Sequence, residues 1–186
     1  MTFSWTPHRF SGGALALDVA NSVVLRFDQQ RRIDRFADTA AMDTFAEAAS
    51  RLCGERQSFG TLTPTAPERR PLLLALRETT DQHFRAQADG EGSDILLADL
   101  LNAIAAALRG GQRQANGFIA LEAAAAHSAL RLVSETHDGR LKVCPNCQWL
   151  FIDRSRNRSR SWCDMAICGN RVKASRHYRK QKEAGP

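Results

Sequence analysis

Four of the five cysteines lie within a 25-residue stretch near the end of the chain, in the pattern C-x2-C-x15-C-x4-C. Zinc favours four soft or borderline ligands in a tetrahedron, and two close pairs joined by a longer segment can supply them. Pro145-Asn146 gives the first pair a tight turn. We therefore expect one structural Zn²⁺, which would supply much of the folding energy of so short a segment. Its ligands are predicted to be Cys144, Cys147, Cys163 and Cys168.

Other roles for these cysteines fit the sequence less well. CPNC alone resembles a thioredoxin-type redox pair, but no βαβ context surrounds it and a second pair is present. A disulfide framework would require export, and MTFSWTPHRF lacks the apolar region of a signal peptide. A catalytic zinc keeps an open position beside three protein ligands, whereas four thiolates fill the shell.

Two further residues could be drawn into the same chemistry. Cys53 falls on the apolar face of a predicted helix, so we interpret it as a small buried hydrophobe. His177 could substitute as a ligand, but we favour a surface position or a phosphate contact for it.

Charge is divided unevenly along the chain. Residues 1–139 hold 14 Lys+Arg and 17 Asp+Glu, a net charge of −3, whereas residues 140–186 hold 12 Lys+Arg and 3 Asp+Glu, a net charge of +9. A weakly acidic body joined to a strongly basic end points to an acidic partner, either nucleic acid or an anionic membrane. We favour nucleic acid and expect no membrane association. No targeting segment is visible, so a cytoplasmic location is expected.

The first 139 residues are expected to form a mainly α domain, with His137-Asp138-Gly139 as its boundary. A helix is predicted to end at Cys53, with Gly54 behind it, and residues 55–64 to form a loop. A second helix is predicted to open with a capping box at Thr65 and Glu68, unless Pro71 delays its start. Ser93 should cap a third helix, which Gly110-Gly111 stops, and residues 112–117 form a polar loop. A fourth helix is predicted from about Ile119 to Thr136, while Ala14–Val24 is ambiguous between strand and helix.

The last part, residues 140–186, is expected to form a small treble-clef-like or ribbon-like zinc module. Trp149–Asp153 and the turn residues 154–159 suggest a short β-hairpin between the cysteine pairs, followed by a helix over 171–182. If extended, the arginines at 154, 156, 158 and 160 would project to one side. The helix adds further cations, and together they form a footprint for a polyanion. The predicted nucleic-acid contacts are Arg154, Arg156, Arg158, Arg160, Arg171, Lys173, Arg176, Arg179 and Lys180.

The segment CPNCQWLFIDRSRNRSRSWCDMAICGNRVKASRHYRK resembles the CGNR zinc finger, whose tetrapeptide is Cys168-Gly169-Asn170-Arg171 here. GGALALDVANSV resembles the opening of the ABATE domain, which accompanies this finger in a bacterial family described as stress-induced transcription regulators. The resemblance implies zinc ligation by the four cysteines, DNA binding by the finger and ligand sensing by the helical domain. It also favours a structural role for Gly169 and Asn170 and a contact role for Arg171.

A small-molecule effector would need a pocket in the helical domain. Asp18 and Asn21 are polar residues in an apolar stretch, and on a helix they would share a face and line a pocket with Arg26. The alternative is that they cross-link the domain through buried hydrogen bonds. A homodimer is also expected, because single small modules bind DNA weakly.

Two other classes of protein remain open. An RNA- or ribosome-associated protein could use the same cations, with Trp149, Phe151 and Trp162 stacking on bases. An enzyme would need an active site in the helical body. The sequence shows no Gly-rich phosphate loop, nucleophile elbow or metal-ligand pair there, so we expect no catalysis.

Overall fold

The computed structural model describes residues 3–109, 117–137 and 139–183. Its α-helices are α1 (Leu15–Ala20), α2 (Thr39–Leu52), α3 (Arg56–Phe59), α4 (Arg70–Ala88), α5 (Asp94–Leu108), α6 (Leu121–Ser134) and α7 (Asn170–Glu183). Shorter helical turns are the 3₁₀ segments η1 (Pro7–Phe10), η2 (Arg35–Ala37) and η3 (Pro67–Arg69), and the π-helical turn η4 (Met165–Gly169). The strands are β1 (Val23–Val24), β2 (Ile33–Asp34), β3 (Leu62–Thr63), β4 (Ile119–Ala120), β5 (Leu141–Val143) and β6 (Leu150–Ile152).

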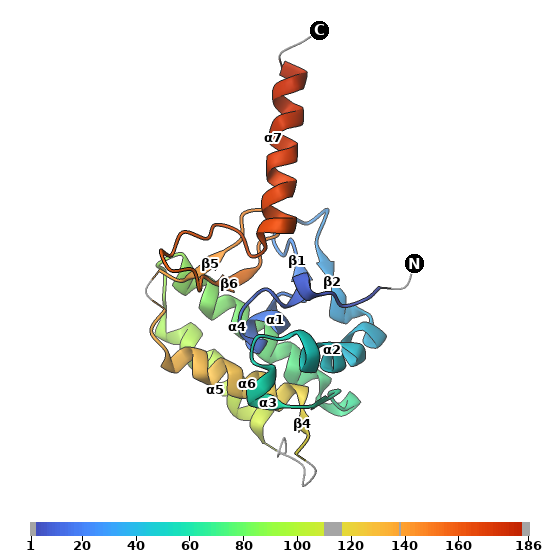
Figure 1. The fold of residues 1–186 in the computed structure, drawn as a ribbon. Helices are drawn as coiled ribbons and strands as arrows, with labels where there is room; N and C mark the ends of the chain where they lie inside the picture. The colour runs from blue at the N-terminus through green and yellow to red at the C-terminus, as the bar shows by residue number, and fades with distance from the viewer. Residues whose placement is uncertain (1–2, 110–116, 138, 184–186) are drawn as a thin grey trace.

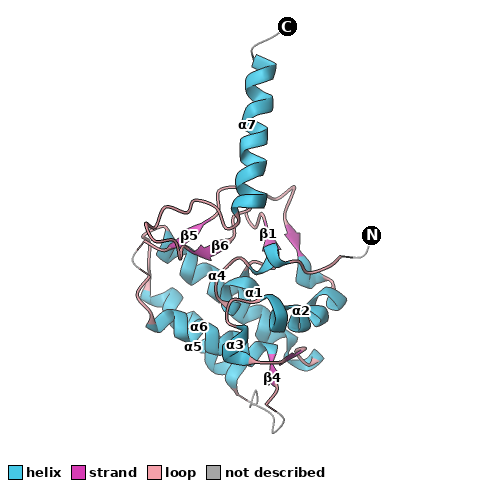
Figure 2. Ribbon diagram, viewed as in Figure 1, coloured by secondary structure: helices cyan, strands magenta, loops and turns pink. Residues whose placement is uncertain are grey.

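The body is a helical assembly in which α4, α5 and α6 pack against one another. The short helix α1 packs against α4 and α6, and every one of its residues is buried. α2 packs against η1, η2, α3 and β3. Figure 2 shows that helices dominate the body and that the strands are short and peripheral. The predicted mainly α fold is therefore confirmed.

Helix ends follow local sequence where a capping residue is present. The Ser93 hydroxyl accepts a hydrogen bond from the Ile95 N–H at 3.3 Å, which confirms the predicted start of α5. The Asp38 carboxylate accepts from the Ala40 N–H at 2.9 Å and caps α2. α2 ends at Leu52 with Cys53 as its cap, one residue before Gly54, as expected. The predicted stop at Gly110-Gly111 and the loop over 112–116 lie outside the described residues.

The prediction of a capping box at Thr65 and Glu68 is wrong. Pro67 forces Ala66 into an extended conformation, with ψ of 145°, so the helix cannot begin at Thr65. A 3₁₀ turn follows, and α4 begins only at Arg70, with Pro71 in its first turn. The Thr65 hydroxyl is buried without a hydrogen-bond partner among the described atoms.

Two other segments differ from or refine the expectation. Residues 55–64 are not a simple loop, because Phe59 and Leu62 are buried and organise α3 and β3. β3 pairs in parallel with β4, with Leu62 opposite Ile119. The ambiguous segment Ala14–Val24 is a helix, α1, followed by the strand β1, which pairs antiparallel with β2.

The expected hairpin is present but formed by different residues. β6 pairs antiparallel with β5, which precedes the first cysteine pair, with Lys142 opposite Phe151. The first cysteine pair is therefore the turn of the hairpin. Residues 154–159 form an irregular loop instead of a returning strand, since Arg158 takes a left-handed φ of 52° and residues 156–157 are a turn.

The finger segment and the body share one hydrophobic core. Leu141, Leu150 and Ile152 belong to the cluster that contains α1, α4 and α6 side chains. A second, smaller cluster holds the four cysteines with Trp149 and Phe151. α7 contacts η4 at its base and projects away from the rest of the molecule, as Figure 1 shows. The division at residue 139 remains a prediction, and Asp138 lies outside the described residues.

Among the described residues, no helix combines the length and apolar character needed to cross a membrane.

Candidate metal centre

The first cysteine pair lies in the tight turn between β5 and β6. The Cys144 N–H donates to the Trp149 carbonyl oxygen at 2.8 Å, and the Gln148 N–H donates to the Cys144 carbonyl oxygen at 2.8 Å. Gln148 adopts a left-handed φ of 63°, a conformation rare for residues with a β-carbon. This reversal presents Cys144 and Cys147 on the same side of the turn.

The second pair is positioned by Asp164. Its carboxylate accepts hydrogen bonds from the Ala166 N–H at 2.8 Å and the Ile167 N–H at 3.2 Å, which starts the π-helical turn η4. The Cys168 N–H donates to the Asp164 carbonyl oxygen at 2.9 Å. A β-carbon at Gly169 would lie 2.5 Å from the Met165 sulfur, so a side chain there would displace the exposed Met165 side chain.

The two pairs converge on one point. All four cysteine sulfurs lie within 4.8 Å of one another. The Sγ atoms of Cys147 and Cys163 are 3.5 Å apart, and those of Cys163 and Cys168 are 3.6 Å apart. A tetrahedron with Zn–S bonds of about 2.3 Å has edges of about 3.8 Å. The donor set and its geometry fit a single structural Zn²⁺ with a complete thiolate shell.

The electrostatics of the cluster favour a bound cation. Hydrogen bonding to Cys144 and Cys163, together with burial and repulsion between the sulfurs, raises the pKa of Cys147. Four buried thiolates would repel one another without a dication between them. The Asn146 side-chain amide donates to the Cys168 sulfur at 3.3 Å and would stabilise its thiolate form. Cys53 lies outside this cluster, at the end of α2, and is buried as expected. The His177 side chain is outside the described part of the structure.

The body braces the finger through several hydrogen bonds. The Leu25 N–H donates to the Cys147 carbonyl oxygen at 3.2 Å, and the Arg85 guanidinium donates to the Gln148 carbonyl oxygen at 2.9 Å. His8 Nδ1 lies 3.0 Å from the Asp164 carboxylate, and its ring packs against Trp149 with centroids 5.1 Å apart. Sequence reasoning missed these contacts because each joins residues more than 60 positions apart.

The arginine-rich loop that follows β6 is organised by Asp153. This buried carboxylate accepts hydrogen bonds from Lys142 Nζ at 2.7 Å, the Ser155 N–H at 2.8 Å and the Arg160 N–H at 2.8 Å. Burial alone would raise its pKa, but these donors hold the pKa of Asp153 well below its usual range. Lys142 Nζ also donates to the carbonyl oxygens of Arg158 and Arg160 at 2.6 and 3.0 Å. The loop therefore wraps around an internal ion pair.

The four arginines of this loop do not form the extended row that a strand would give. Arg154 donates to the Gly13 carbonyl oxygen at 2.8 Å, so it fastens the loop to the body. Arg160 donates to the Trp162 carbonyl oxygen at 2.7 Å and lies over the Phe151 ring. Arg156 and Arg158 have exposed side chains. The arrangement differs from the expectation because Asp153 holds the loop in turns.

α7 carries the remaining predicted contacts. Arg171 and Lys173 are exposed on its first turns. The backbone positions of Arg176, Arg179 and Lys180 lie in the same helix, but their side chains are outside the described part of the structure.

The three residues proposed for an effector pocket have different surroundings in the structure. Asp18 is buried and its carboxylate accepts from the Gly12 N–H at 2.9 Å. Asn21 is buried and pairs with the backbone of Leu150. Arg26 lies on the wall of an open cavity of about 570 Å³ between α4 and the loop after β1, where it pairs with Glu78 and Asp81. Its guanidinium also donates to the carbonyl oxygen of Ala20, the neighbour of Asn21, at 3.1 Å.

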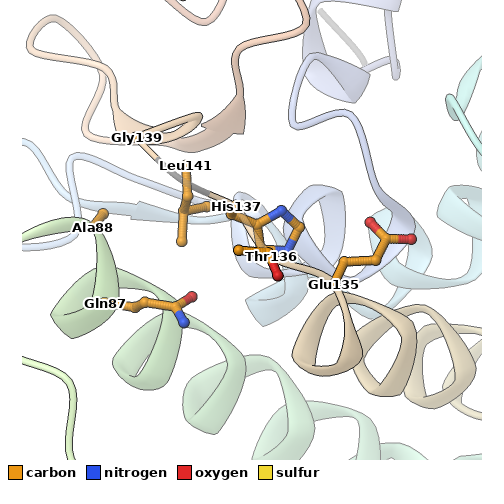
Figure 3. Close-up of a pocket in the computed structure, with 7 residues that line it drawn as sticks. All are labelled: Gln87, Ala88, Glu135, Thr136, His137, Gly139 and Leu141. Carbon is orange, nitrogen blue, oxygen red and sulfur yellow. The ribbon is translucent and has the colours of Figure 1, made fainter.

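A second cavity, of about 440 Å³, lies where the body meets the finger. Figure 3 shows the Leu141 side chain, from β5, extending toward α4, which carries Gln87 and Ala88. Glu135, Thr136 and His137 come from the segment that follows α6. His137 Nε2 is within 2.9 Å of the Leu132 carbonyl oxygen, so that nitrogen carries the proton. The cavity therefore has walls from both parts of the chain.

Comparison with known proteins bears on the C-terminal part. Residues 140–181 match the family model of the CGNR zinc finger. No curated protein and no solved structure matches the chain. The resemblance of the N-terminal part to the ABATE domain stays a prediction, because the match lies beyond it. The match coincides with the four converging cysteines, and residues 140–181 of this chain form a CGNR zinc finger that binds one structural Zn²⁺.

Proposed function

We propose that the protein binds double-stranded DNA through this finger and acts as a transcription regulator. The observation that carries the proposal is the projection of α7 away from the molecule, visible in Figure 1. α7 has 14 residues, which corresponds to about 21 Å of helix. It carries six Lys and Arg residues against Glu183 alone. The major groove of B-DNA is about 12 Å wide and accepts an α-helix, so a basic helix held clear of the body suits it.

The aromatic residues beside the cysteines do not form a surface for stacking single-stranded RNA bases. Trp149 and Phe151 are 2% and 0% exposed, and Trp162 is half-buried, so the first two cannot stack on bases. Recognition of unstacked bases commonly uses exposed aromatic rings. Tyr178, on α7, is 71% exposed, so one aromatic ring of the finger remains open to a base. The cations and hydrogen-bond donors around it suit a phosphate backbone and base edges.

The proposal includes regulation by an effector and a homodimer. The junction cavity of Figure 3 supports the first, because a ligand there would contact α4 of the body and β5 of the finger at once. A homodimer would link two zinc fingers and so raise their combined affinity for DNA. Sedimentation equilibrium of the zinc-loaded chain tests the dimer, and a monomer throughout would remove that part of the proposal.

The central experiment is fluorescence anisotropy of a labelled random DNA duplex, titrated with the zinc-loaded protein between about 50 and 200 mM salt. We expect the logarithm of the association constant to fall steeply with the logarithm of salt, by about 0.9 for each phosphate neutralised. Unlabelled duplex should compete better than single-stranded RNA. Preference for RNA would replace the DNA proposal with an RNA-binding one, and no binding even at about 50 mM salt would reject both.

A pair of variants localises the contact. Lys173→Gln with Lys182→Gln removes two exposed cations from α7, whereas Arg51→Gln with Arg109→Gln removes two exposed cations from the body. The first variant should bind roughly tenfold more weakly with a shallower salt dependence, and the second should bind as the unmodified protein does. Equal losses in both variants would indicate attraction by net charge instead of contact through α7.

A further inference from the structure

Three arginines from different parts of the chain gather at the base of α7. Arg9 belongs to η1, Arg35 to η2 and Arg171 to the first turn of α7. The Arg9 and Arg35 guanidinium carbons lie 5.6 and 4.3 Å from the centre of the same ring, that of Phe3. Arg9 also lies 5.5 Å from the centre of the Trp149 ring, which packs on the cysteine cluster. Arg9 thus contacts the zinc finger directly, and Arg35 shares the Phe3 ring with it.

Among the described residues, Arg9, Arg35 and Arg171 have no carboxylate partner, in contrast to six arginines of the body. Arg26, Arg69, Arg70, Arg77, Arg85 and Arg131 each form an ion pair with Asp or Glu. Within residues 3–109, 117–137 and 139–183, no such ion pair involves Arg9, Arg35 or Arg171. The Arg35 Nε atom is buried and has no hydrogen-bond partner among the described atoms. This cluster therefore has an unused donor at Arg35 and no carboxylate partner.

The charges are close enough to disfavour one another. Burial, followed by the positive charges of Arg35 and Arg171, lowers the pKa of Arg9, and the negative charges of Cys147 and Cys168 offset part of this effect. Burial lowers the pKa of Arg35. Burial also lowers the pKa of His8, and the positive charges of Arg9 and Arg171 act in the same direction. Guanidinium groups that repel one another in the folded protein would be stabilised by an anion placed between them. Arginine suits a phosphate in particular, because its planar fork donates two parallel hydrogen bonds.

We propose that Arg9, Arg35 and Arg171 form a phosphate-binding site at the junction of body and finger, and that its occupant is a backbone phosphate of the nucleic acid that α7 contacts. The inference rests on the proposed function. It adds that the helical body takes part in the interface and is not only a sensor. The β1–β2 hairpin lies at the same end of the body as the base of α7 (Figure 1). The Leu25 N–H, just after β1, donates to the Cys147 carbonyl oxygen, and the Arg35 N–H, just after β2, donates to the Ser22 carbonyl oxygen. A phosphate contact of this kind would fix the orientation of α7 on the duplex.

The test compares three full-length, zinc-loaded proteins by duplex anisotropy over a range of salt. Arg9→Gln with Arg35→Gln should weaken binding by roughly tenfold and reduce the salt slope by about 1 to 2. Arg51→Gln with Arg109→Gln removes the same charge from exposed body positions and should change neither quantity. If the double variant of Arg9 and Arg35 keeps the affinity and slope of the unmodified protein, the inference is overturned while the DNA-binding proposal stands. If the unmodified protein binds no nucleic acid, both are overturned.

Two further measurements separate the site from other roles of these arginines. If the glutamine double variant loses zinc or melts several degrees lower, Arg9→Lys with Arg35→Lys is used instead. The lysine variant keeps both positive charges but lacks the planar guanidinium group, which donates two parallel hydrogen bonds. Weaker duplex binding by that folded variant supports the site, and unchanged binding overturns it. The last measurement compares the stabilisation of the zinc-loaded protein by inorganic phosphate with that by chloride at equal ionic strength. A variant that loses stabilisation by phosphate yet binds duplex normally would show a site for a free anion and overturn the assignment to nucleic acid.

Discussion

The Asn21 side chain and the Leu150 backbone form a two-point hydrogen-bonded pair. Asn21 Nδ2 donates to the Leu150 carbonyl oxygen at 2.8 Å, and the Leu150 N–H donates to Asn21 Oδ1 at 2.9 Å. Two residues further along β6, the Ile152 N–H donates to the Gly12 carbonyl oxygen at 2.9 Å. The body therefore covers the outer edge of β6 much as a neighbouring strand would, and the zinc finger is fixed on it.

Replacing Asn21 by Ala should lower the free energy of unfolding by about 2 to 4 kcal/mol. The change leaves one donor and one acceptor of Leu150 buried and unpaired, and each such group costs about 1–3 kcal/mol. Urea unfolding of the zinc-loaded protein, followed by tryptophan fluorescence, measures the effect. Asn102→Ala, at an exposed position of α5, is the matched control and should change stability by less than about 0.5 kcal/mol. A loss no larger than that of the control would show that the pair does not hold the finger.

Removal of zinc should expose four thiols and leave the fifth protected. In the zinc-loaded protein the four ligands are buried and coordinated, and burial together with the Asp18 charge raises the pKa of the Cys53 thiol. A thiol reagent at pH 8 should then react with few or none of the five cysteines. After treatment with a strong chelator, Cys144, Cys147, Cys163 and Cys168 should react rapidly.

Zinc content gives the control for this prediction. Cys53→Ser should retain one Zn²⁺ per chain, whereas Cys163→Ser should bind zinc much more weakly and lose the folded finger. Zinc release can be followed with a colorimetric chelator. Loss of zinc from the Cys53 variant alone would contradict the assignment of the ligands.

Asp18→Asn should stabilise the protein increasingly as pH rises. Burial, with the charge of Glu55, raises the pKa of Asp18 well above its usual range. A carboxyl group with a raised pKa in the folded state contributes its full stability below the unfolded pKa of about 3.9 and loses it as pH rises through the folded pKa. Asparagine stays neutral and keeps an oxygen for the Gly12 N–H, so it does not incur this loss.

Urea unfolding at pH 6 and pH 9 measures the difference between Asp18→Asn and the unmodified protein. The advantage of the variant should widen over this interval by on the order of 1–3 kcal/mol. Asp99→Asn, at an exposed position of α5, should show no comparable trend. A constant or shrinking difference would mean that Asp18 is already ionised in the folded protein at pH 6.

Sequence reasoning was most successful where neighbours in the chain determine the result. The cysteine spacing predicts the zinc ligands because each pair lies in one local turn, and Ser93 predicts the start of α5 because a cap bonds two residues ahead. The capping box at Thr65 failed although its residues are correct, since Pro67 restricts the residue before it. Local rules of this kind compete, and spacing alone does not show which one prevails.

Long-range contacts account for most of what the sequence did not reveal. Asn21 could be read as polar and buried, but its partner, Leu150, is 129 residues away. The cluster of Arg9 and Arg35 was hidden because residues 1–139 carry a net negative charge, which says nothing about where individual cations gather. The left-handed conformation of Arg158 likewise depends on surrounding tertiary contacts, and no glycine marks the position.

The arginine loop offers the final prediction, because its shape depends on one buried carboxylate. Asp153→Asn would lose the ion pair with Lys142, and an amide nitrogen there would face the Lys142 ammonium or the Arg160 N–H with a donor instead of an acceptor. The loop over 154–160 should then open while β5, β6 and the zinc site stay in place. Limited digestion by trypsin, which cleaves after the exposed arginines, should become at least several-fold faster in this loop, with zinc content unchanged.

Asp28→Asn, in the exposed loop between β1 and β2, is the control for removing a negative charge. The hydrogen bonds and the Lys142 ion pair lower the pKa of Asp153 in the folded protein. The stability that Asp153 contributes is therefore present above its unfolded pKa and is lost only as pH falls through its lower folded pKa. Protection of the loop from trypsin should therefore not vary between pH 7 and 9. Equal cleavage rates in the two variants would show that Asp153 is not what holds the loop.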